Sequence, residues 1–437
     1  MSASRPLCIH WFRRDLRWHD NRALHAALQS EWDVLPLFIF DETILGSLKP
    51  EDPRVTFIHE TIAAMKVESD GRGKAFCIAH GKPKETFEHL FAQHDVRAVF
   101  VNEDYEPRAV ERDEAIEALC QARGVRFEAF KDHVIMAPGE VLKPDGLPYT
   151  VFTPFSKRWH ANLTEEALRP APSESMLHAL VEGNSSSMPS LESMGFKGSQ
   201  HQIPACAIDQ SVVKSYHETR DIPSIQGTSR ISVHLRFGTL SIRQAANQGR
   251  ALNDKWLTEL IWRDFYQAII KFFPHSVNKA FKPAYDRVPW EWNEEHFERW
   301  RRGETGYPLV DAGMRELAAT GFMHNRVRMV VASFFCKHLL HDWRLGERHF
   351  AETLMDFELA SNVGGWQWAS GTGCDAAPYF RVFNPTSQWA KFDPQSEYVR
   401  TWVPEFEDLT YVKPVVEHKW ARQRAIDTYK SALANPT

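Results

Sequence analysis

The stretch LCIHWFRRDLRWHDNRALHAALQ, residues 7–29, decides the fold of the N-terminal part of the chain. Its first six residues, Leu7 to Phe12, form a short and largely apolar run, which is typical of a buried β-strand. After the charged residues that end this run, Asp20 or Asn21 is placed to cap a helix from about Asn21 to Gln29. A strand that is followed directly by a helix is the repeating unit of a parallel β-sheet.

The same alternation of strand and helix continues as far as residue 121. This order predicts a doubly wound parallel sheet with helices on both faces. Ligands of such sheets bind beyond the carboxyl ends of the strands, and Arg13, Arg14 and Arg17 follow the first strand there. The three arginines could hold an anionic ligand or form a solvated charge cluster. The further strands are expected at Val34–Phe40, Ala75–Ala79 and Ala98–Asn102, and the helices at Arg54–Lys66, Lys84–Gln93 and Pro107–Gln121.

The composition of the chain changes after this sheet. Ser, Pro, Gly and Met are enriched from about Ala171 to Ala205, where weak periodicity indicates a connector between domains. We therefore expect an α/β domain over residues 1–132, a long connector over residues 133–205 and an all-helical domain over residues 206–437. Long amphipathic helices of the last part are expected at Trp256–Phe272, Glu294–Arg302, Pro308–Thr320 and Asn325–Asp342.

Composition and charge exclude several classes of protein. With 437 residues, of which 43% are hydrophobic and 25% charged, the chain can build two or three domains with substantial cores. Its net charge of −5 means that any nucleic-acid binding must depend on a local basic patch. Six cysteines without a CxxC pair predict neither a zinc site nor an iron–sulfur cluster, so no metal is expected. The lack of a signal peptide and of a membrane-length apolar segment predicts a cytoplasmic protein without membrane contact.

One helix face carries four side chains that are costly to bury. Burying a carboxylate and a guanidinium without partners costs roughly a few kcal/mol. The stripe therefore either faces solvent or lines a ligand site, and the apolar residues on the rest of the helix favour the ligand site. The four residues follow one another at helical spacing within the predicted helix Trp256–Phe272: Glu259, Trp262, Arg263 and Tyr266.

A second polar segment opens the predicted helix Asn325–Asp342. The amide of Asn325 could read the edge of a nucleic-acid base, and Arg326 could hold phosphate. The alternative is structural, with Asn325 as the helix cap, Met329 in the core and the arginines paired with acids. Arg328 and Asp356 are expected to form an ion pair between helices.

Two tryptophans stand on a glycine-flanked backbone, beside an amide side chain, in the stretch NVGGWQWASGTG from Asn362 to Gly373. Indole is a large and readily oxidised ring, and glycine lets a flat ligand approach the backbone closely. Redox chemistry or base stacking competes here with plain core packing. The segment Gly227 to Ser232 offers hydroxyls and backbone amides at a candidate helix start, as a phosphate cradle does.

In combination these segments resemble the photolyase/cryptochrome family, and most closely its class I cyclobutane pyrimidine dimer photolyases. The resemblance covers nearly the whole chain. It implies an N-terminal α/β antenna domain, a long interdomain linker and a C-terminal all-helical domain that binds FAD. Six motifs in order carry it: WFRRDLR (Trp11–Arg17), TSRIS (Thr228–Ser232), ELIWRDFY (Glu259–Tyr266), GYPLVDAG (Gly306–Gly313), MHNRVRM (Met323–Met329) and GGWQWASGTGCDAAPYFRVFNP (Gly364–Pro385).

The resemblance also implies which residues bind the cofactor. Asn362 would face the N5 atom of the flavin, where an amide can stabilise the reduced form. Plant-type cryptochromes place an acid at that position, so Asn362 favours repair over signalling. The other residues expected around FAD are Tyr216, Thr228, Ser229, Arg230, Ile231 and Ser232 at its phosphates, and Trp256, Glu259, Arg263, Tyr266, Asn325, Arg328, Asp356, Phe357 and Glu358 around the rest.

For the substrate, the resemblance implies a flipped-out cyclobutane pyrimidine dimer in UV-damaged DNA. Glu259 and Asn325 would hydrogen-bond the lesion. Trp262 and Trp368 would form walls of its pocket, against which Met329 would pack. The (6-4) photolyases place histidines where this chain has Asn325 and Met329, which favours the cyclobutane dimer. Three arginines match phosphate-contacting positions and would supply the local basic patch: Arg220, Arg326 and Arg381.

The implied reaction is driven by light. Excited FADH⁻ would pass an electron to the dimer, the cyclobutane ring would split and the electron would return, so the enzyme would be a carbon–carbon lyase without net redox change. Glu259, Asn325 and Asn362 would be the catalytic residues. Trp366, Trp343 and Trp290 match the family's electron-hopping chain from the flavin to the surface.

Departures from the family pattern leave alternatives open. Val363 stands where close relatives often carry a second asparagine, and Arg108 and Ala109 stand where folate-antenna members carry Asn and Glu. The second chromophore could therefore be a deazaflavin, a folate or none. The rival interpretations are a cryptochrome-type blue-light photoreceptor, a (6-4) photolyase, and a nucleotide-binding α/β protein without light chemistry. The protein is expected to act as a monomer.

Overall fold

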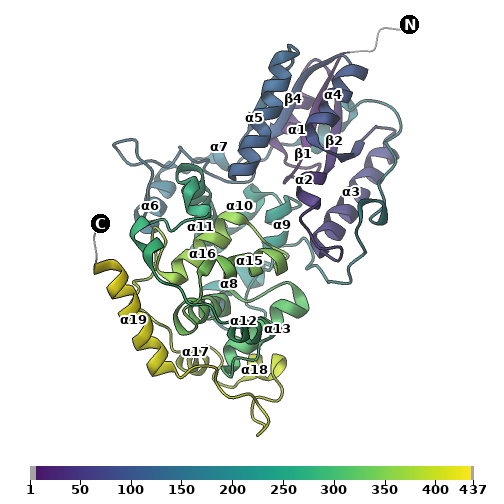
Figure 1. Ribbon diagram of the computed structural model, residues 1–437. Coiled ribbons are helices and arrows are strands. Elements are labelled where there is room, and N and C mark those ends of the chain that lie inside the picture. The colour runs from purple at the N-terminus through teal and green to yellow at the C-terminus, as the bar shows by residue number, and fades with distance from the viewer. Residues whose placement is uncertain (1–5, 435–437) are drawn as a thin grey trace. The chain divides into compact units, whose positions relative to one another are not determined.

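The computed structural model describes residues 6–434, which form two compact units that interleave along the chain (Figure 1). The first unit contains the described residues up to Ala137, together with Leu163–Ala207 and Ile231–Asn247. The second contains Pro138–Asn162, Ile208–Arg230 and the described residues from Gln248 onward. The sequence suggested three consecutive parts, 1–132, 133–205 and 206–437. Each unit of the structure instead draws on several separate segments of the chain.

The first unit is built on a five-stranded parallel sheet, and this confirms the predicted fold class. The strand order is β3-β2-β1-β4-β5. The chain adds strands to one side of β1 up to β3 and then to the other side with β4 and β5. Every residue of β1 is buried because helices cover both faces of the sheet. The strands are β1 (Leu7–Phe12), β2 (Asp33–Asp41), β3 (Cys77–Gly81), β4 (Val96–Asn102) and β5 (Arg126–Phe130), and the helices around them include α1 (Arg22–Leu28), α3 (Pro53–Gly71), α4 (Pro83–Gln93) and α5 (Pro107–Ala122).

The helix after β1 begins as the sequence indicates, but the arginines beyond that strand do not behave as expected. Asn21 caps α1 by accepting from the amide of Leu24 at 3.0 Å. Arg17 is buried and Arg13 and Arg14 are half-buried, and each of the three is paired with an acid. Of the two alternatives that the sequence left open, a solvated cluster is wrong, and each of the three charges has an acidic partner. The pairs are Arg13 with Asp113 at 2.5 Å, Arg14 with Asp104 at 3.1 Å and Arg17 with Asp132 at 2.6 Å.

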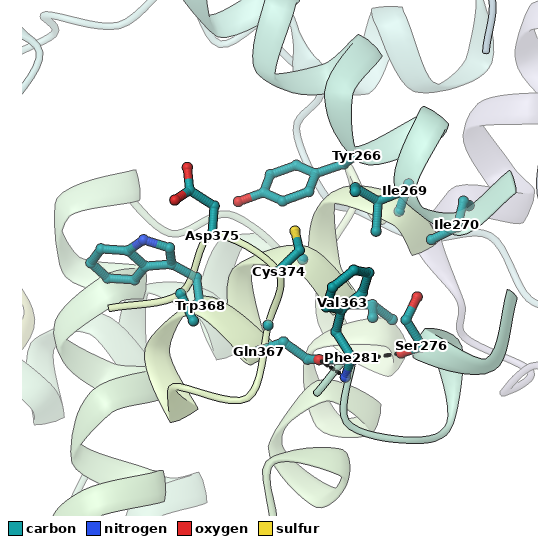
Figure 2. A pocket seen from close by; sticks show the side chains of 14 residues that line it. Tyr266, Ile269, Ile270, Ser276, Phe281, Val363, Gln367, Trp368, Cys374 and Asp375 are labelled. Atoms are coloured by element: carbon teal, nitrogen blue, oxygen red, sulfur yellow. Dashed lines mark hydrogen bonds between the residues drawn. The ribbon is translucent and has the colours of Figure 1, made fainter. Parts of the chain in front are cut away.

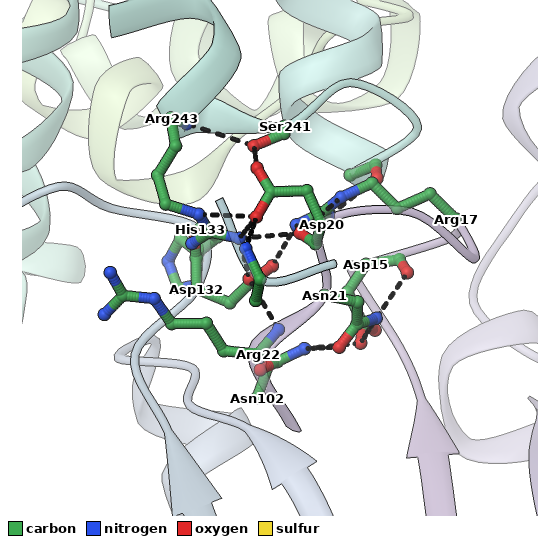
Figure 3. A network of polar contacts seen from close by, with 12 residues as sticks. Asp15, Arg17, Asp20, Asn21, Arg22, Asn102, Asp132, His133, Ser241 and Arg243 are labelled. Atoms are coloured by element: carbon green, nitrogen blue, oxygen red, sulfur yellow. Dashed lines mark hydrogen bonds and ion pairs between the residues drawn. The ribbon is translucent and has the colours of Figure 1, made fainter. Parts of the chain in front are cut away.

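A buried ionic network ties the segment Ile231–Asn247 to this end of the sheet (Figure 3). Arg243 lies 2.7 Å from Asp20 and 2.8 Å from Asp132, and it is only 1% exposed. The hydroxyl of Ser241 donates to Asp20 as well. Burial opposes the ionisation of Asp132, but Arg17 and Arg243 outweigh it and hold the pKa of that carboxyl below its usual range.

The second unit is helical in the part that the structure describes. No helix among the described residues is long and apolar enough to cross a bilayer. The longer helices are α6 (Phe152–Asn162), α8 (Gln210–Thr219), α11 (Asp254–Phe272), α12 (Glu294–Arg302), α13 (Pro308–Thr320), α14 (Asn325–Ser333), α15 (Trp343–Thr353), α16 (Leu359–Ser370), α17 (Pro385–Phe392) and α19 (His418–Ala434).

The predicted helix Asn325–Asp342 is wrong in its second half. Helix α14 ends at Ser333 and is followed by a π-helical turn over Phe334–His338. Beyond this turn, Leu340 has a φ of +55°. Asp342 then caps α15 by accepting from the amide of Arg344. The break is invisible in the sequence because the residues before it are apolar in a nearly continuous run, which hides any helical period.

Replacement of Arg243 by methionine should destabilise the first unit strongly. The change would leave Asp20 without its cation and Asp132 with Arg17 alone, and breaking a buried pair in this way costs about 3–5 kcal/mol. Urea unfolding followed by circular dichroism measures the loss. The matched control is Arg72→Ala, which removes an exposed pair with Glu68 and should cost about 0–1 kcal/mol. Equal effects of the two changes would contradict the importance of the network.

Candidate functional site

Helix α16 approaches its two neighbours unusually closely because glycines stand at the contacts. A Cβ atom on Gly364 would lie 2.3 Å from the ring of Tyr266 on α11. A Cβ atom on Gly346 of α15 would lie 2.1 Å from the ring of Trp366. The sequence suggested that glycine here lets a flat ligand approach the backbone. Gly364 instead makes room for an aromatic ring of the chain itself. The next residue, Gly365, faces open space, so a Cβ atom there would meet nothing.

Asn362 is held in one orientation by its neighbour Glu347 on α15. The Nδ2 group of Asn362 donates to the backbone oxygen of Glu347 at 3.0 Å and to its Oε1 atom at 2.9 Å. Both amide protons are used in these bonds, so the Oδ1 atom remains as an acceptor. Burial raises the pKa of Glu347, and the bond from Asn362 only partly offsets this effect. No sequence pattern singles out Glu347, since its contact depends on the packing of α15 against α16.

The polar stripe of α11 is partnered within the second unit. Arg263 pairs with Glu358 at 2.9 Å, and Glu259 pairs with Arg220 at 2.5 Å. Burial raises the pKa of Glu259 although Arg220 acts in the opposite direction. Tyr216 lies beneath the guanidinium of Arg220, 5.3 Å from it, and burial raises its pKa too. The stripe is thus half-buried, and its charged groups are paired with other site residues.

Trp262 has one face covered by an aromatic ring that no sequence motif indicates. Phe152, at the start of α6, stacks on Trp262 with 3.5 Å between ring centroids and 4° between planes. The backbone amide of Phe152 is anchored by Asp375 at 2.9 Å. Any further stacking partner of Trp262 must use the opposite face of the indole.

A small, largely apolar cavity of about 20 Å³ lies between α11 and α16 (Figure 2). Tyr266 and Trp368 stand on its wall, and Asp375 and Cys374 close it from the loop that follows α16. Two of the residues expected at the cofactor or lesion, Tyr266 and Trp368, are thereby brought to one cavity. Trp368 also contacts Phe383 at 6.2 Å between ring centroids.

The start of α14 differs from the expected cap. His324, not Asn325, is the capping residue, and its Nδ1 atom accepts from the amide of Arg326 at 3.2 Å. Asn325 is exposed and does not cap the helix. The predicted ion pair of Arg328 with Asp356 is confirmed, at 3.0 Å.

The arginines expected at DNA phosphates differ in their surroundings. Arg326 pairs with Asp221 at 2.7 Å and approaches the sulfur of Met329 at 3.7 Å. Arg220 pairs with Glu259. Arg381 is exposed, and its guanidinium lies 5.5 Å from the ring centroid of Phe383. Two of the three positive charges are therefore balanced locally by acids.

The segment from Thr228 to Arg230 in the second unit has the properties of an anion site. Trp256 donates from Nε1 to the hydroxyl of Ser229 at 3.3 Å. Arg230 has a φ of +51°, lies over Phe322 at 4.1 Å and keeps a buried Nε atom without a hydrogen-bond partner. Such an unpartnered cationic group fits a phosphate oxygen. Thr228, Ser229 and Arg230 belong to the second unit, whereas Ile231 and Ser232 open helix α9 (Ser232–Phe237) of the first.

The three tryptophans of the expected electron chain gather around one apolar core. Trp366 and Trp343 are buried in it, and Trp290 packs against its edge. Phe357 packs against the same core. Trp300 is a further indole of this core, with 6.2 Å between its ring centroid and that of Trp366.

Comparison with known proteins places this arrangement in a family. Residues 256–410 match the FAD binding domain of DNA photolyase, and residues 8–174 match the DNA photolyase domain. A helical flavin domain combined with a parallel-sheet domain defines a flavoprotein class. The chain belongs to the DNA photolyase family.

Three relatives match over nearly their whole length. A deoxyribodipyrimidine photo-lyase of Salmonella typhimurium is 37% identical over 98% of this chain and 99% of its own. A class III photolyase of Agrobacterium tumefaciens has a TM-score of 0.85 at 30% identity and covers 100% of this chain and 99% of its own. A photolyase of Sulfolobus tokodaii with two FAD molecules has a TM-score of 0.82 at 32% identity, covering 97% and 99%.

The two adjacent glycines of α16 should respond oppositely to alanine. Gly364→Ala pushes a methyl group into the ring of Tyr266, and overpacking of this kind costs about 1–3 kcal/mol. Gly365→Ala meets nothing and gains helix propensity of up to about 1 kcal/mol. Thermal unfolding of the two variants compares them directly. A stable Gly364→Ala variant would show that α16 does not need this close approach.

Proposed function

We propose that the protein is a light-driven DNA repair enzyme that binds FAD and splits cyclobutane pyrimidine dimers. The observation that carries the proposal is the position of Asn362 and Trp368 on the single helix α16. Six residues of helix span only about 9 Å along the axis. A flavin at Asn362 and a lesion at the cavity wall of Trp368 would then lie close enough for direct electron exchange.

The residues around these two points fit the flavin nucleotide. The unpartnered Nε atom of Arg230, with the hydroxyls of Thr228, Ser229 and Ser232, would hold its phosphates beside Tyr216 and Ile231. The Oδ1 atom of Asn362 would accept from the flavin N5–H group, which exists only in reduced forms. The remaining cofactor contacts that we propose are Trp256, Glu259, Arg263, Tyr266, Asn325, Arg328, Asp356, Phe357 and Glu358.

The reduced flavin, when bound, supplies an electron on illumination and takes it back after the ring has split. The protein's part is to position and to stabilise. Glu259, whose pKa is raised by burial and lowered by Arg220, would form a hydrogen bond with the dimer. Asn325 is exposed and not engaged as a cap, so its amide is available to the lesion. Trp262, backed by Phe152, and Trp368 would clamp the flipped bases.

Contacts with DNA would come from Arg220, Arg326 and Arg381. Since the first two are balanced by Glu259 and Asp221, phosphate binding requires an exchange of partners for those two arginines. We further propose that the protein acts as a monomer in the cytoplasm. Repair is favoured over a photoreceptor role because the proposed lesion contacts Glu259, Asn325, Met329 and Trp368 are all present.

The purified protein, with its flavin reduced, should restore the absorbance of intact thymine in dimer-containing DNA under blue or near-UV light. Glu259→Ala should weaken lesion binding roughly 10- to 100-fold, the value of a hydrogen bond to a charged or strongly polar group, while FAD stays bound. Trp262→Ala should have a similar effect through lost stacking. Glu295→Ala, at an exposed acid of α12, is the control. Full repair by both pocket variants would show that the pocket is assigned wrongly, and no repair by the parent would favour the photoreceptor.

Trp343→Phe should block the photoreduction of oxidised flavin and spare repair by enzyme that is already reduced. The indole is removed from the buried path between Trp366 and Trp290, whereas the lesion pocket is untouched. Absorption spectra under continuous light with a thiol reductant follow the first reaction. Trp292→Phe changes an exposed indole outside the proposed chain and should leave photoreduction intact. Normal photoreduction in the Trp343 variant would remove this residue from the path.

A further inference from the structure

Phe152 and Trp262 are held in a geometry that aromatic pairs disfavour. Only 4° separates their ring planes, and the ring centroids are 3.5 Å apart. Carbon atoms in contact are about 3.5–4.0 Å apart, so the two rings lie directly over each other. Aromatic pairs prefer an offset stack or an edge-to-face contact, because the negative faces of two rings repel each other. The surrounding chain must therefore impose this overlay.

Two hydrogen bonds anchor α6, the helix that carries Phe152, within the second unit. At the start of α6, the backbone amide of Phe152 donates to the Oδ2 atom of Asp375 at 2.9 Å. Two turns further along, the Nε1 atom of Trp159 donates to the Oδ2 atom of Asp264 on α11 at 2.9 Å. Helix α6 therefore cannot slide Phe152 off the indole without breaking one of these bonds.

Trp262 keeps part of its ring accessible although it has several aromatic neighbours. Phe265 meets the indole edge-on, with 5.7 Å between ring centroids and 80° between planes, and Tyr266 lies 5.4 Å away on the same helix. Phe152 is buried, whereas Trp262 is only half-buried. Because Phe152 covers one face of the indole, a flat ligand can stack only on the other.

Asp375 connects this stack with the second indole that we propose at the lesion. Asp375 lies in the loop that follows α16, on the wall of the same cavity as Trp368 and Tyr266 (Figure 2). Trp368 stands in the last turn of α16, directly before that loop. The hydrogen bond from Phe152 to Asp375 therefore joins the support of one indole to the segment that carries the other.

The spacing of two flat walls determines what binds between them. Stacking on an aromatic ring is favourable for any base, but two walls both contribute only if their separation and orientation match the ligand. A wall that tilts freely has to be ordered when the ligand binds, and this ordering reduces the affinity. Walls that are held in place before binding avoid that loss and also fix the orientation of the bound bases.

We infer that Phe152 and Asp375 are positioning residues of the lesion pocket. Phe152 fixes the plane of Trp262, and Asp375 holds Phe152 at a constant place relative to the loop beyond Trp368. The inference rests on the proposed function, which puts a pyrimidine dimer against both indoles. Neither positioning residue has to touch the dimer, since each acts through the walls that do.

Phe152→Leu separates the effect of a flat ring from that of apolar volume. Leucine fills much of the space but cannot hold the indole plane, so the affinity for dimer-containing DNA should fall roughly 3- to 10-fold, the value of one aromatic pair. The repair yield per absorbed photon should also fall when all the DNA is bound, because the dimer is then held in several orientations. Fluorescence anisotropy titration of the FAD-bound protein measures the affinity, and repair under calibrated light measures the yield.

Phe155→Leu is the matched control. Phe155 lies on the same helix, is 2% exposed and packs on Phe265 with 5.1 Å between ring centroids. Its replacement should lower the thermal stability about as much as Phe152→Leu does, since the same volume is removed from the same interface. Lesion affinity and repair yield should stay those of the parent. A merely structural role of Phe152 would make the two variants alike in all three measurements.

Asp375→Ala should act in the same direction as Phe152→Leu because it releases the start of α6. Asp375→Asn should restore most of the loss, since the amide oxygen of asparagine can still accept from the backbone amide of Phe152. The double variant with Phe152→Leu and Asp375→Ala should bind no more weakly than the weaker single variant, because both changes free the same indole. Additive losses would show that the two residues act separately and would overturn the proposed link between the walls.

The orientation of Trp262 can be followed without DNA or light by fluorine NMR of the FAD-bound protein labelled with 5-fluorotryptophan. The resonance of Trp262 is identified by its loss in Trp262→Phe. Phe152→Leu should shift and broaden this resonance, and Phe155→Leu should leave it in place. An unmoved resonance in Phe152→Leu, or parent-like affinity and yield in that variant, would overturn the inference. Failure of the parent to repair dimers counts against the proposed function, while the resonance still decides whether Phe152 fixes the indole.

Discussion

The closeness of α16 to α11 and α15 is the constraint on which the site depends. Gly364 lets the ring of Tyr266 lie against one side of the helix, and Gly346 lets Trp366 press against the backbone on the other. A helix that is packed closely at two contacts cannot rotate about its axis, because any rotation would move an aromatic ring into the backbone. This close packing orients Asn362 toward Glu347 and Trp368 toward the cavity.

Charge pairing completes what the close packing begins. Arg263 joins α11 to Glu358 at the start of α16, and Arg328 joins α14 to Asp356 just before it. Both bonds are made within the second unit and converge on the turn that leads into α16. A buried ion pair adds little net stability, but it fixes geometry, since each charge is costly to leave alone. The polar groups are therefore set in place before any ligand is bound.

The sequence predicted those features that repeat locally and missed those that depend on distant partners. Periodicity located α12 and α13 and the first four strands, but β5 was missed because RFEAF, residues 126–130, is a half-exposed edge strand without an apolar run. The partnership of Arg328 with Asp356 could be anticipated from charge. Neither Glu347 nor Phe152 could be, since only the packed helices bring them to Asn362 and Trp262.

The ionic network of the first unit bears on how the chain is made. Asp20 and Arg243 are separated by 223 residues, and the cation emerges from the ribosome long after the acids that it neutralises. A nascent chain that has completed all five strands still lacks this counterion, so the sheet has to wait in an unfinished state while the intervening helices are synthesised. Translation speed and chaperone contact over that interval would then influence the yield of native protein.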